Sequence, residues 1–175
     1  IFNNLTPLDV NPENYWLPLL GYFTGMRIEE LCQLRIEDIA KVGGVDCIHV
    51  SPEAGSLKTI NAERIVPIHS HLIELGFLDY VNELDANASN RLWQKLKANA
   101  YGKYSSAYSK RFGKFKREIG IKDNQLTFHS FRHTFANELK QVDVSEHLIA
   151  QLIGHSNSSI TMSRYGKGYK PAVML

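Results

Sequence analysis

The apolar pattern of this 175-residue chain changes period around Gly43-Gly44, and this change constrains the fold more than any other feature. Up to about residue 34 and again from about residue 70, apolar residues recur every three to four positions, as they do on one face of a helix. Between the helical stretches, residues 46–50 alternate as in a strand, and residues 57–59 and 64–68 are further strand candidates. The sequence therefore predicts a mainly α-helical domain of the α+β class with a small three-stranded antiparallel sheet.

The helical periodicity predicts eight segments, over residues 13–24, 28–34, 70–84, 90–98, 104–118, 129–142, 145–153 and 158–165. Asn11-Pro12 offers the first segment a cap and a first position, and Gly25 offers it a stop. No repeat, low-complexity tract or linker divides the chain, so we expect one domain over residues 1–175.

Composition excludes several classes of protein. With 43% hydrophobic and 22% charged residues, the chain has the balance of a globular domain and not of a disordered or fibrous one. No apolar run approaches the roughly 18 residues that cross a bilayer, so we expect that the chain is not an integral membrane protein. Cys32 and Cys47 belong to no CxxC pair, and we expect both to be reduced, structural residues of a cytosolic protein.

The net charge of +2 conceals an uneven distribution of charge. Residues 1–90 carry five basic and thirteen acidic side chains, whereas residues 91–122 carry ten basic side chains and one acid, Glu118. Aromatic residues lie among these basic ones: Trp93, Tyr101, Tyr104, Tyr108, Phe112 and Phe115. This mixture favours a surface that binds a phosphate backbone. The alternative is a solvated helix face whose aromatic residues lie in the core.

Four segments hold polar residues that a core would not select. In the first, Arg27 stands at a helix start, where its guanidinium group and the backbone amides can bind an oxyanion. The alternative role for Arg27 is a pairing with Glu30 or Asp38. In the second, Lys58 ends a strand candidate, although a lone lysine in that position is usually a solvated edge residue.

The third segment, His129–His133, opens a predicted helix and places His129 and Arg132 on one face, because they are three positions apart. His129 and His133 have a spacing that zinc ligands can have. However, no glutamate follows His129 and no cysteine cluster accompanies it, so the pattern favours an anion site over a metal site.

The fourth segment places His155 after Gly154 and Tyr165 ten residues further on. Taken alone, this histidine is more typical of a helix end and this tyrosine of a half-buried core position. Taken together, the four segments contain the parts of a metal-free phosphoryl transfer: positive charge for the non-bridging oxygens, an acid, a base and a nucleophile.

The sequence resembles the tyrosine recombinases, or phage-type integrases. The matching segments, in the order of that family, are Thr24–Leu31 (TGMRIEEL), Lys58 with Arg64–Pro67 (RIVP), His129–His133 (HSFRH), Leu152–Ser156 (LIGHS) and Ser163–Gly168 (SRYGKG). The resemblance implies the catalytic core of a DNA breaking-rejoining enzyme, mainly helical with a small sheet, that uses neither a metal nor a cofactor.

The resemblance also implies the nucleophile. Tyr165 would attack the scissile DNA phosphate and form a 3′-phosphotyrosyl bond, leaving a free 5′-hydroxyl. Tyr169 is a competitor for this role, but the spacing between LIGHS and RYGKG favours Tyr165.

The same resemblance implies roles for five other residues. Arg27 and Arg132 would hold the non-bridging oxygens, and His155 would add a hydrogen bond to them. Lys58 would be the general acid for the leaving 5′-oxygen, and His129 would be the general base or an organiser of the site.

Partners follow from the resemblance as well. Family members carry a DNA-clamping domain before the first arginine segment, whereas 26 residues precede Arg27 here, so we expect an isolated catalytic domain that binds its site weakly. The expected partner is double-stranded DNA, on which four copies would assemble from free monomers. Ala172 to Leu175 are candidates for packing on a neighbouring subunit. We expect a bacterial or phage-encoded protein of the host cytoplasm.

Two other functions remain open. Val144 to Tyr165 also has the pattern of a helix-turn-helix with Gly154 at the turn, which is typical of a non-catalytic DNA-binding module. Such a module would not explain Arg27, Lys58 and Arg132. A relaxing topoisomerase of type IB would use the same chemistry as a recombinase.

Overall fold

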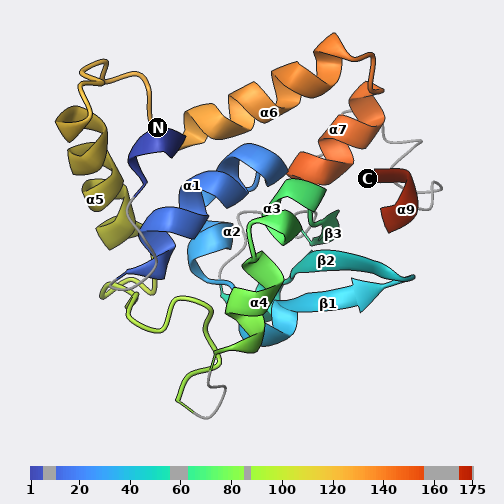
Figure 1. The fold of residues 1–175 in the computed structure, drawn as a ribbon, viewed down its shortest axis with the longest axis horizontal. Coiled ribbons are helices and arrows are strands. Elements are labelled where there is room, and N and C mark those ends of the chain that lie inside the picture. Colours follow the sequence, from blue (N-terminus) through green and yellow to red (C-terminus); the bar gives the residue numbers. More distant parts are fainter. Residues whose placement is uncertain (6–10, 56–62, 85–87, 156–169, 175) are drawn as a thin grey trace.

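The computed structural model describes residues 1–5, 11–55, 63–84, 88–155 and 170–174. Its elements are three short 3-10 helices, a three-stranded sheet and a set of α-helices around a central helix, α1 (Figure 1). The predicted class, mainly α with a small antiparallel sheet, is confirmed. None of the helices in the described part of the chain has the length and apolar character that crossing a membrane requires.

Helix α1 (Pro12–Thr24) forms the centre of the core. Its side chains Trp16, Leu17 and Leu20 are fully buried, and the helix packs on α6, α2 and α3. Pro12 occupies the first helical position, while the Asn11 side chain makes no capping hydrogen bond within the described residues. Gly25 ends the helix as predicted, with a left-handed φ of 62°.

The sheet has the order β1-β2-β3 and is antiparallel throughout. Its strands are β1 (Ile39–Val42), β2 (Val45–Val50) and β3 (Arg64–Pro67), with Ile39 opposite Ile48 and Cys47 opposite Pro67. The two strands predicted at 46–50 and 64–68 are confirmed, and the one predicted at 57–59 lies outside the described residues. The edge strand β1 was not predicted. It forms because Gly43 and Gly44, with φ of 58° and 85°, make a two-residue hairpin turn.

The remaining helices are α2 (Ile28–Cys32), α3 (Ser70–Glu74), α4 (Phe77–Asn82), α5 (Ser105–Glu118), α6 (His129–Gln141), α7 (Glu146–Ile153) and α9 (Pro171–Met174). The 3-10 helices are Phe2–Asn4, Ile36–Asp38 and Pro52–Ala54. The helices predicted at 104–118, 129–142 and 145–153 are confirmed as α5, α6 and α7. The one predicted at 70–84 is divided at Gly76, whose φ is 87°. The one predicted at 158–165 lies outside the described residues.

The helix predicted over residues 90–98 is wrong. This segment is irregular, and its backbone pairs with residues 34–36: the Leu92 amide donates to Leu34 O (3.0 Å) and the Ile36 amide to Asn90 O (2.8 Å). Trp93 is buried and donates its Nε1 hydrogen to Leu31 O at 2.6 Å. The apolar spacing that suggested a helix comes from residues that anchor this irregular segment to the core.

Helix α9 lies against β3 and β2 of its own chain, and Gln151 Nε2 donates to Met174 Sδ at 3.2 Å. The predicted contact of residues 172–175 with a neighbouring subunit stays a prediction. Both cysteines are buried and unpaired, as expected for reduced, structural residues.

Candidate active site

Arg27 lies at the start of α2 and is fixed by three hydrogen bonds. Its backbone amide donates to Glu30 Oε2 (2.9 Å), its Nη1 to Glu30 Oε1 (2.9 Å) and its Nη2 to Gly154 O (3.1 Å). The pairing with Glu30 that we considered as an alternative role is therefore present, while Asp38 binds Arg35 instead. The pairing still leaves about a fifth of the Arg27 side chain exposed, so the arginine is both held in place and accessible.

Arg132 lies in the first turn of α6 and is almost fully buried, with 3% of its surface exposed. Its Nη1 donates to Gly25 O at 2.8 Å, directly beyond the end of α1. Its Nη2 is buried and has no hydrogen-bond partner among the described residues. A buried charged donor without a partner costs free energy unless a ligand satisfies it. Burial, followed by the charges of Arg27 and Arg64, lowers the pKa of Arg132 to about 10.

Arg64, at the start of β3, is the third arginine of this cluster. Its Nη2 donates to Glu30 Oε2 (2.8 Å) and its Nε to Leu152 O (2.7 Å). Glu30 therefore lies between two arginines, and their hydrogen bonds and charges, acting against its burial, lower its pKa. Arg64 and Glu30 were not proposed as site residues from the sequence. The signal for both was their place inside the TGMRIEEL and RIVP segments.

His155 follows Gly154, which ends α7 in the left-handed conformation (φ 67°) as the sequence predicted. Its backbone amide donates to Ala150 O at 2.9 Å, and its side chain is exposed. Burial of part of the ring lowers the pKa of His155, and the positive charges of Arg132, Arg27, His129 and Arg64 lower it further. Arg27, Arg64, His129 and Arg132 are therefore near enough to His155 to act on its charge.

His129, the first residue of α6, is exposed at the surface. Its ring stands nearly perpendicular to that of His133, with ring centroids 4.9 Å apart. The structure thus brings together four of the six residues implied by the resemblance, Arg27, His129, Arg132 and His155. The other two, Lys58 and Tyr165, lie outside the described residues, as does Tyr169.

The donor set of this cluster suits an anion. Guanidinium groups carry positive charge and only donate hydrogen bonds, so they bind carboxylates and phosphates and cannot ligate a metal. Within the described residues, no group of three or more His, Cys, Asp or Glu side chains is arranged to hold a metal ion. This donor set, drawn from four separate parts of the chain, makes the cluster a candidate oxyanion site.

The basic segment 91–122 has a divided role. Trp93, Tyr108 and Phe112 are buried in the core, as the alternative interpretation held, whereas Tyr101 is 88% exposed. Lys116 is also buried and donates to the carbonyl oxygens of Asp123 and Leu126. Basic side chains that remain exposed are Lys95, Lys97, Lys103, Lys110, Lys114, Arg117 and Lys122.

Comparison with known proteins identifies the family of the chain. The model of the phage integrase family matches residues 9–170. A tyrosine recombinase of Pseudothermotoga lettingae is 32% identical over 152 residues, covering 86% of this chain and 48% of the relative. The tyrosine recombinase XerD of Staphylococcus epidermidis is 31% identical over 81% of this chain and 46% of its own length. The chain therefore spans about half the length of these curated relatives.

Two solved structures share the fold. The XerH site-specific recombinase, in a pre-cleavage complex with its difH substrate, has a TM-score of 0.58 and 27% identity over 87% of this chain and 41% of its own. The lambda integrase catalytic core has a TM-score of 0.54 and 20% identity, over 85% of this chain and 86% of its own. With the family model matched over almost the whole sequence, the chain belongs to the phage integrase family.

Proposed function

We propose that this chain is the catalytic domain of a site-specific DNA recombinase, which cuts and rejoins strands through a 3′-phosphotyrosyl intermediate without a metal ion. The observation that carries the proposal is the buried Nη2 of Arg132 near Arg27, which has no hydrogen-bond partner in the described part of the chain. Family membership supports it, because relatives are named tyrosine recombinases and the XerH structure holds its DNA substrate.

The arginine cluster supplies the electrostatic part of the reaction. Negative charge accumulates on the non-bridging oxygens while the phosphate is attacked, and fixed cationic donors stabilise that charge without reorganising. Arg27 and Arg132 are fixed in advance by the carbonyl oxygens of Gly154 and Gly25. Each guanidinium group would therefore already be oriented when the phosphate binds.

The covalent step in this proposal is a displacement at phosphorus. The Tyr165 oxygen forms a bond to phosphorus while the bond to the 5′-oxygen breaks, and Lys58 gives its proton to that leaving oxygen. His129 accepts the tyrosine proton or organises the site. A free tyrosine has a pKa of about 10, so about a thousandth is ionised at neutral pH, and the surrounding cations favour the phenolate. The reverse displacement rejoins the strand and needs no ATP.

His155 would add a hydrogen bond to the same phosphate. Its lowered pKa favours the neutral imidazole, which still donates one hydrogen bond. Glu30 accepts hydrogen bonds from Arg27 on one carboxylate oxygen and from Arg64 on the other, so two cations offset the negative charge that it brings near the proposed phosphate.

The proposed partner is double-stranded DNA. Exchange between two duplexes requires two cleavages on each, hence four active sites and a homotetramer on DNA formed from free monomers, in the host cytoplasm. Residues 1–175 would supply the catalytic domain of that assembly, and a second domain would provide the remaining contacts with DNA.

The test is covalent capture. The chain is incubated with nicked duplexes of randomised sequence and the reaction is stopped with detergent. We expect a protein–DNA adduct whose phosphotyrosine maps to Tyr165 by mass spectrometry. Tyr165→Phe should abolish the adduct and keep DNA binding within about threefold, while the exposed Tyr101→Phe, as a matched control, should leave the adduct unchanged. Sequence-specific binding with no adduct would instead establish the helix-turn-helix module.

A further inference from the structure

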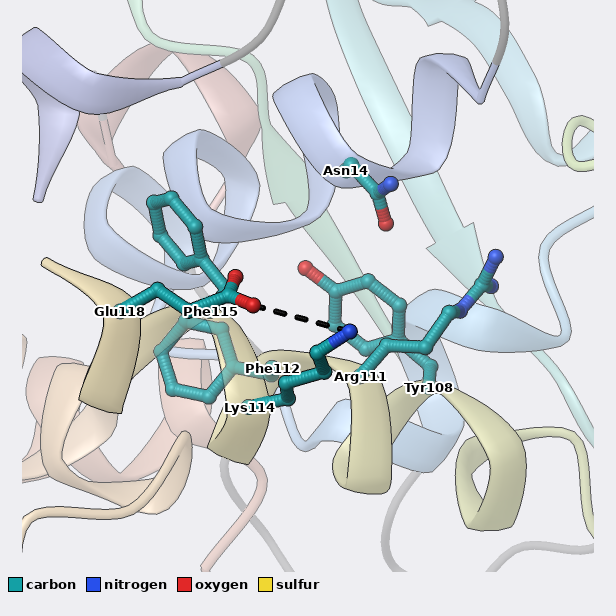
Figure 2. A pocket seen from close by; sticks show the side chains of 7 residues that line it. All are labelled: Asn14, Tyr108, Arg111, Phe112, Lys114, Phe115 and Glu118. Carbon is teal, nitrogen blue, oxygen red and sulfur yellow. Dashed lines mark ion pairs between the residues drawn. The ribbon is translucent and has the colours of Figure 1, made fainter.

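Two hollows flank α5, and they differ in charge. Figure 2 shows the first, where Arg111, Lys114 and Glu118 project from one face of the helix. Both cations of this face are paired with acids: Lys114 Nζ lies 3.6 Å from Glu118 Oε1, and Arg111 Nη2 lies 2.8 Å from Glu13 Oε1. This hollow is therefore close to neutral.

The second hollow, which we call the α5 groove, runs between α5 and residues 124–129. Its polar lining consists of Ser109, Lys116, Arg117, Asn124, Thr127 and His129. None of the described residues that line it is acidic. Lys116 is buried and donates to the carbonyl oxygens of Asp123 and Leu126, so it holds the segment that forms the outer wall against α5.

The α5 groove borders the candidate active site. His129 lines it and is one of the cations that act on His155. Ile28, which follows Arg27 in the chain, also lines it. A chain of phosphates with one member at Arg27 and Arg132 could therefore continue past His129 between walls that carry positive charge and hydrogen-bond donors.

We propose that the α5 groove binds the DNA strand beside the scissile phosphate, with Arg117 contacting a backbone phosphate. The opposite face of α5, drawn in Figure 2, stays out of contact with DNA. This inference rests on the proposed function, and it names the face of α5 that meets the substrate.

The helix offers two matched pairs of variants. Ala107 and Ser109 are both exposed in the first turns of α5, but Ala107 shares the face of Arg111 and Lys114, whereas Ser109 lines the groove. Ala107→Asp and Ser109→Asp therefore add the same charge to opposite faces. Arg117→Gln and Lys114→Gln remove the same charge from the groove and from the Figure 2 face.

The measurement is binding of a 30-base-pair duplex of mixed sequence, by fluorescence anisotropy at several salt concentrations. We expect Ser109→Asp to weaken binding about fivefold or more and Ala107→Asp less than about twofold. Arg117→Gln should lower the slope of log affinity against log salt by about 1, and Lys114→Gln should leave it unchanged. Thermal unfolding by circular dichroism checks that each variant is folded.

The outcomes separate this inference from the proposed function. Equal effects within both pairs, or a salt slope that Arg117→Gln does not change, would overturn the groove while leaving the Tyr165 adduct intact. Loss of binding confined to the Figure 2 variants would also overturn it. An unaltered chain that neither binds duplex DNA nor forms the adduct would overturn both proposals.

Discussion

At the scale of single residues, Arg132 is the most informative side chain. It is buried, it is charged, and one of its two terminal nitrogens has a partner while the other has none among the described residues. Burying this charged donor costs free energy in the unliganded protein, and a bound anion would offset that cost.

Arg132→Lys should lower the rate of adduct formation by about 10²- to 10³-fold, because an ammonium group cannot donate to Gly25 O and the phosphate with the same planar geometry. DNA affinity should change by less than about threefold. The matched control is Arg111→Lys, which alters an arginine paired with Glu13 on the far face of α5. Equal losses of rate in both variants would contradict a catalytic role for Arg132.

The pKa of His155 gives a second prediction at this scale. Burial and the neighbouring cations hold this pKa below the ordinary value of 6.5, so the unfolded chain binds a proton at a pH where the folded chain does not. Stability contributed by the neutral ring is present above pH 6.5 and is lost as pH falls from 6.5 toward the folded pKa.

An NMR titration of the His155 ring should therefore show a midpoint below 6.5. Arg132→Gln should raise this midpoint, since it removes the largest repulsive charge, and Arg111→Gln should not. A midpoint at or above 6.5 in the unaltered chain would show that the cations do not surround His155.

At the scale of elements, the five-residue helix α2 connects the site to the rest of the domain. Arg27 starts it, and Glu30 holds Arg27 and Arg64. Glu29 accepts hydrogen bonds from the backbone amides of Tyr104 and Ser105, both at 2.9 Å, and so caps α5. One helix therefore fixes the arginine cluster and the start of the basic helix relative to each other.

Arg64→Met should destabilise the domain by about 3 kcal/mol, because it removes one partner of a carboxylate that is 4% exposed. Urea unfolding measures this loss. The control Lys41→Met, which breaks the exposed pair with Asp46, should cost less than about 1 kcal/mol. A loss for Arg64→Met no larger than that of the control would mean that Glu30 does not depend on Arg64.

Gly154→Ala tests the turn that presents His155. A β-carbon at Gly154 would lie 2.6 Å from Arg64 Nη1, in addition to the strain of φ 67°. Gly102 has a similar φ of 71° and open space around it, so Gly102→Ala measures the backbone strain alone, about 1 kcal/mol. Gly154→Ala should cost clearly more in urea unfolding, and equal costs would show that Arg64 yields freely.

The longest helices, α1, α5 and α6, were predicted well because their apolar period continues over three turns or more, and α7 was predicted from a shorter period that Gly154 ends. The failures have local causes. Residues 90–98 space their apolar side chains like a helix, but Leu92 and Trp93 anchor a segment whose backbone pairs with residues 34–36. The edge strand β1 is short, and its hairpin signal, Gly43-Gly44, was interpreted as a turn alone.

The candidate site was predictable only in part, because local sequence patterns do not contain tertiary contacts. Motif spacing predicts Arg27, His129, Arg132 and His155 as members of the candidate site, but spacing does not show which charges meet in space. Glu30 and Arg64 are 34 positions apart, and their pairing depends on the tertiary fold, which no local pattern contains.

At the scale of the whole molecule, one core holds the separate parts of the site in place. Helix α1 contacts α6 and α2, so it fixes the starts of both helices that carry the arginines (Figure 1). The β-carbon of any residue at Gly21 would lie 2.8 Å from the Phe128 ring, directly before His129. Close packing of α1 on α6 therefore determines where the anion site forms.

The account depends most on one claim, that these cations hold a single phosphate. A crystal structure with vanadate, an analogue of phosphate under attack, tests it directly. We predict one vanadate contacted by Arg27, by the Nη2 of Arg132 and by His155, with Tyr165 close enough to bond to it. A vanadate bound elsewhere, with the Nη2 of Arg132 still without a partner, would contradict the account.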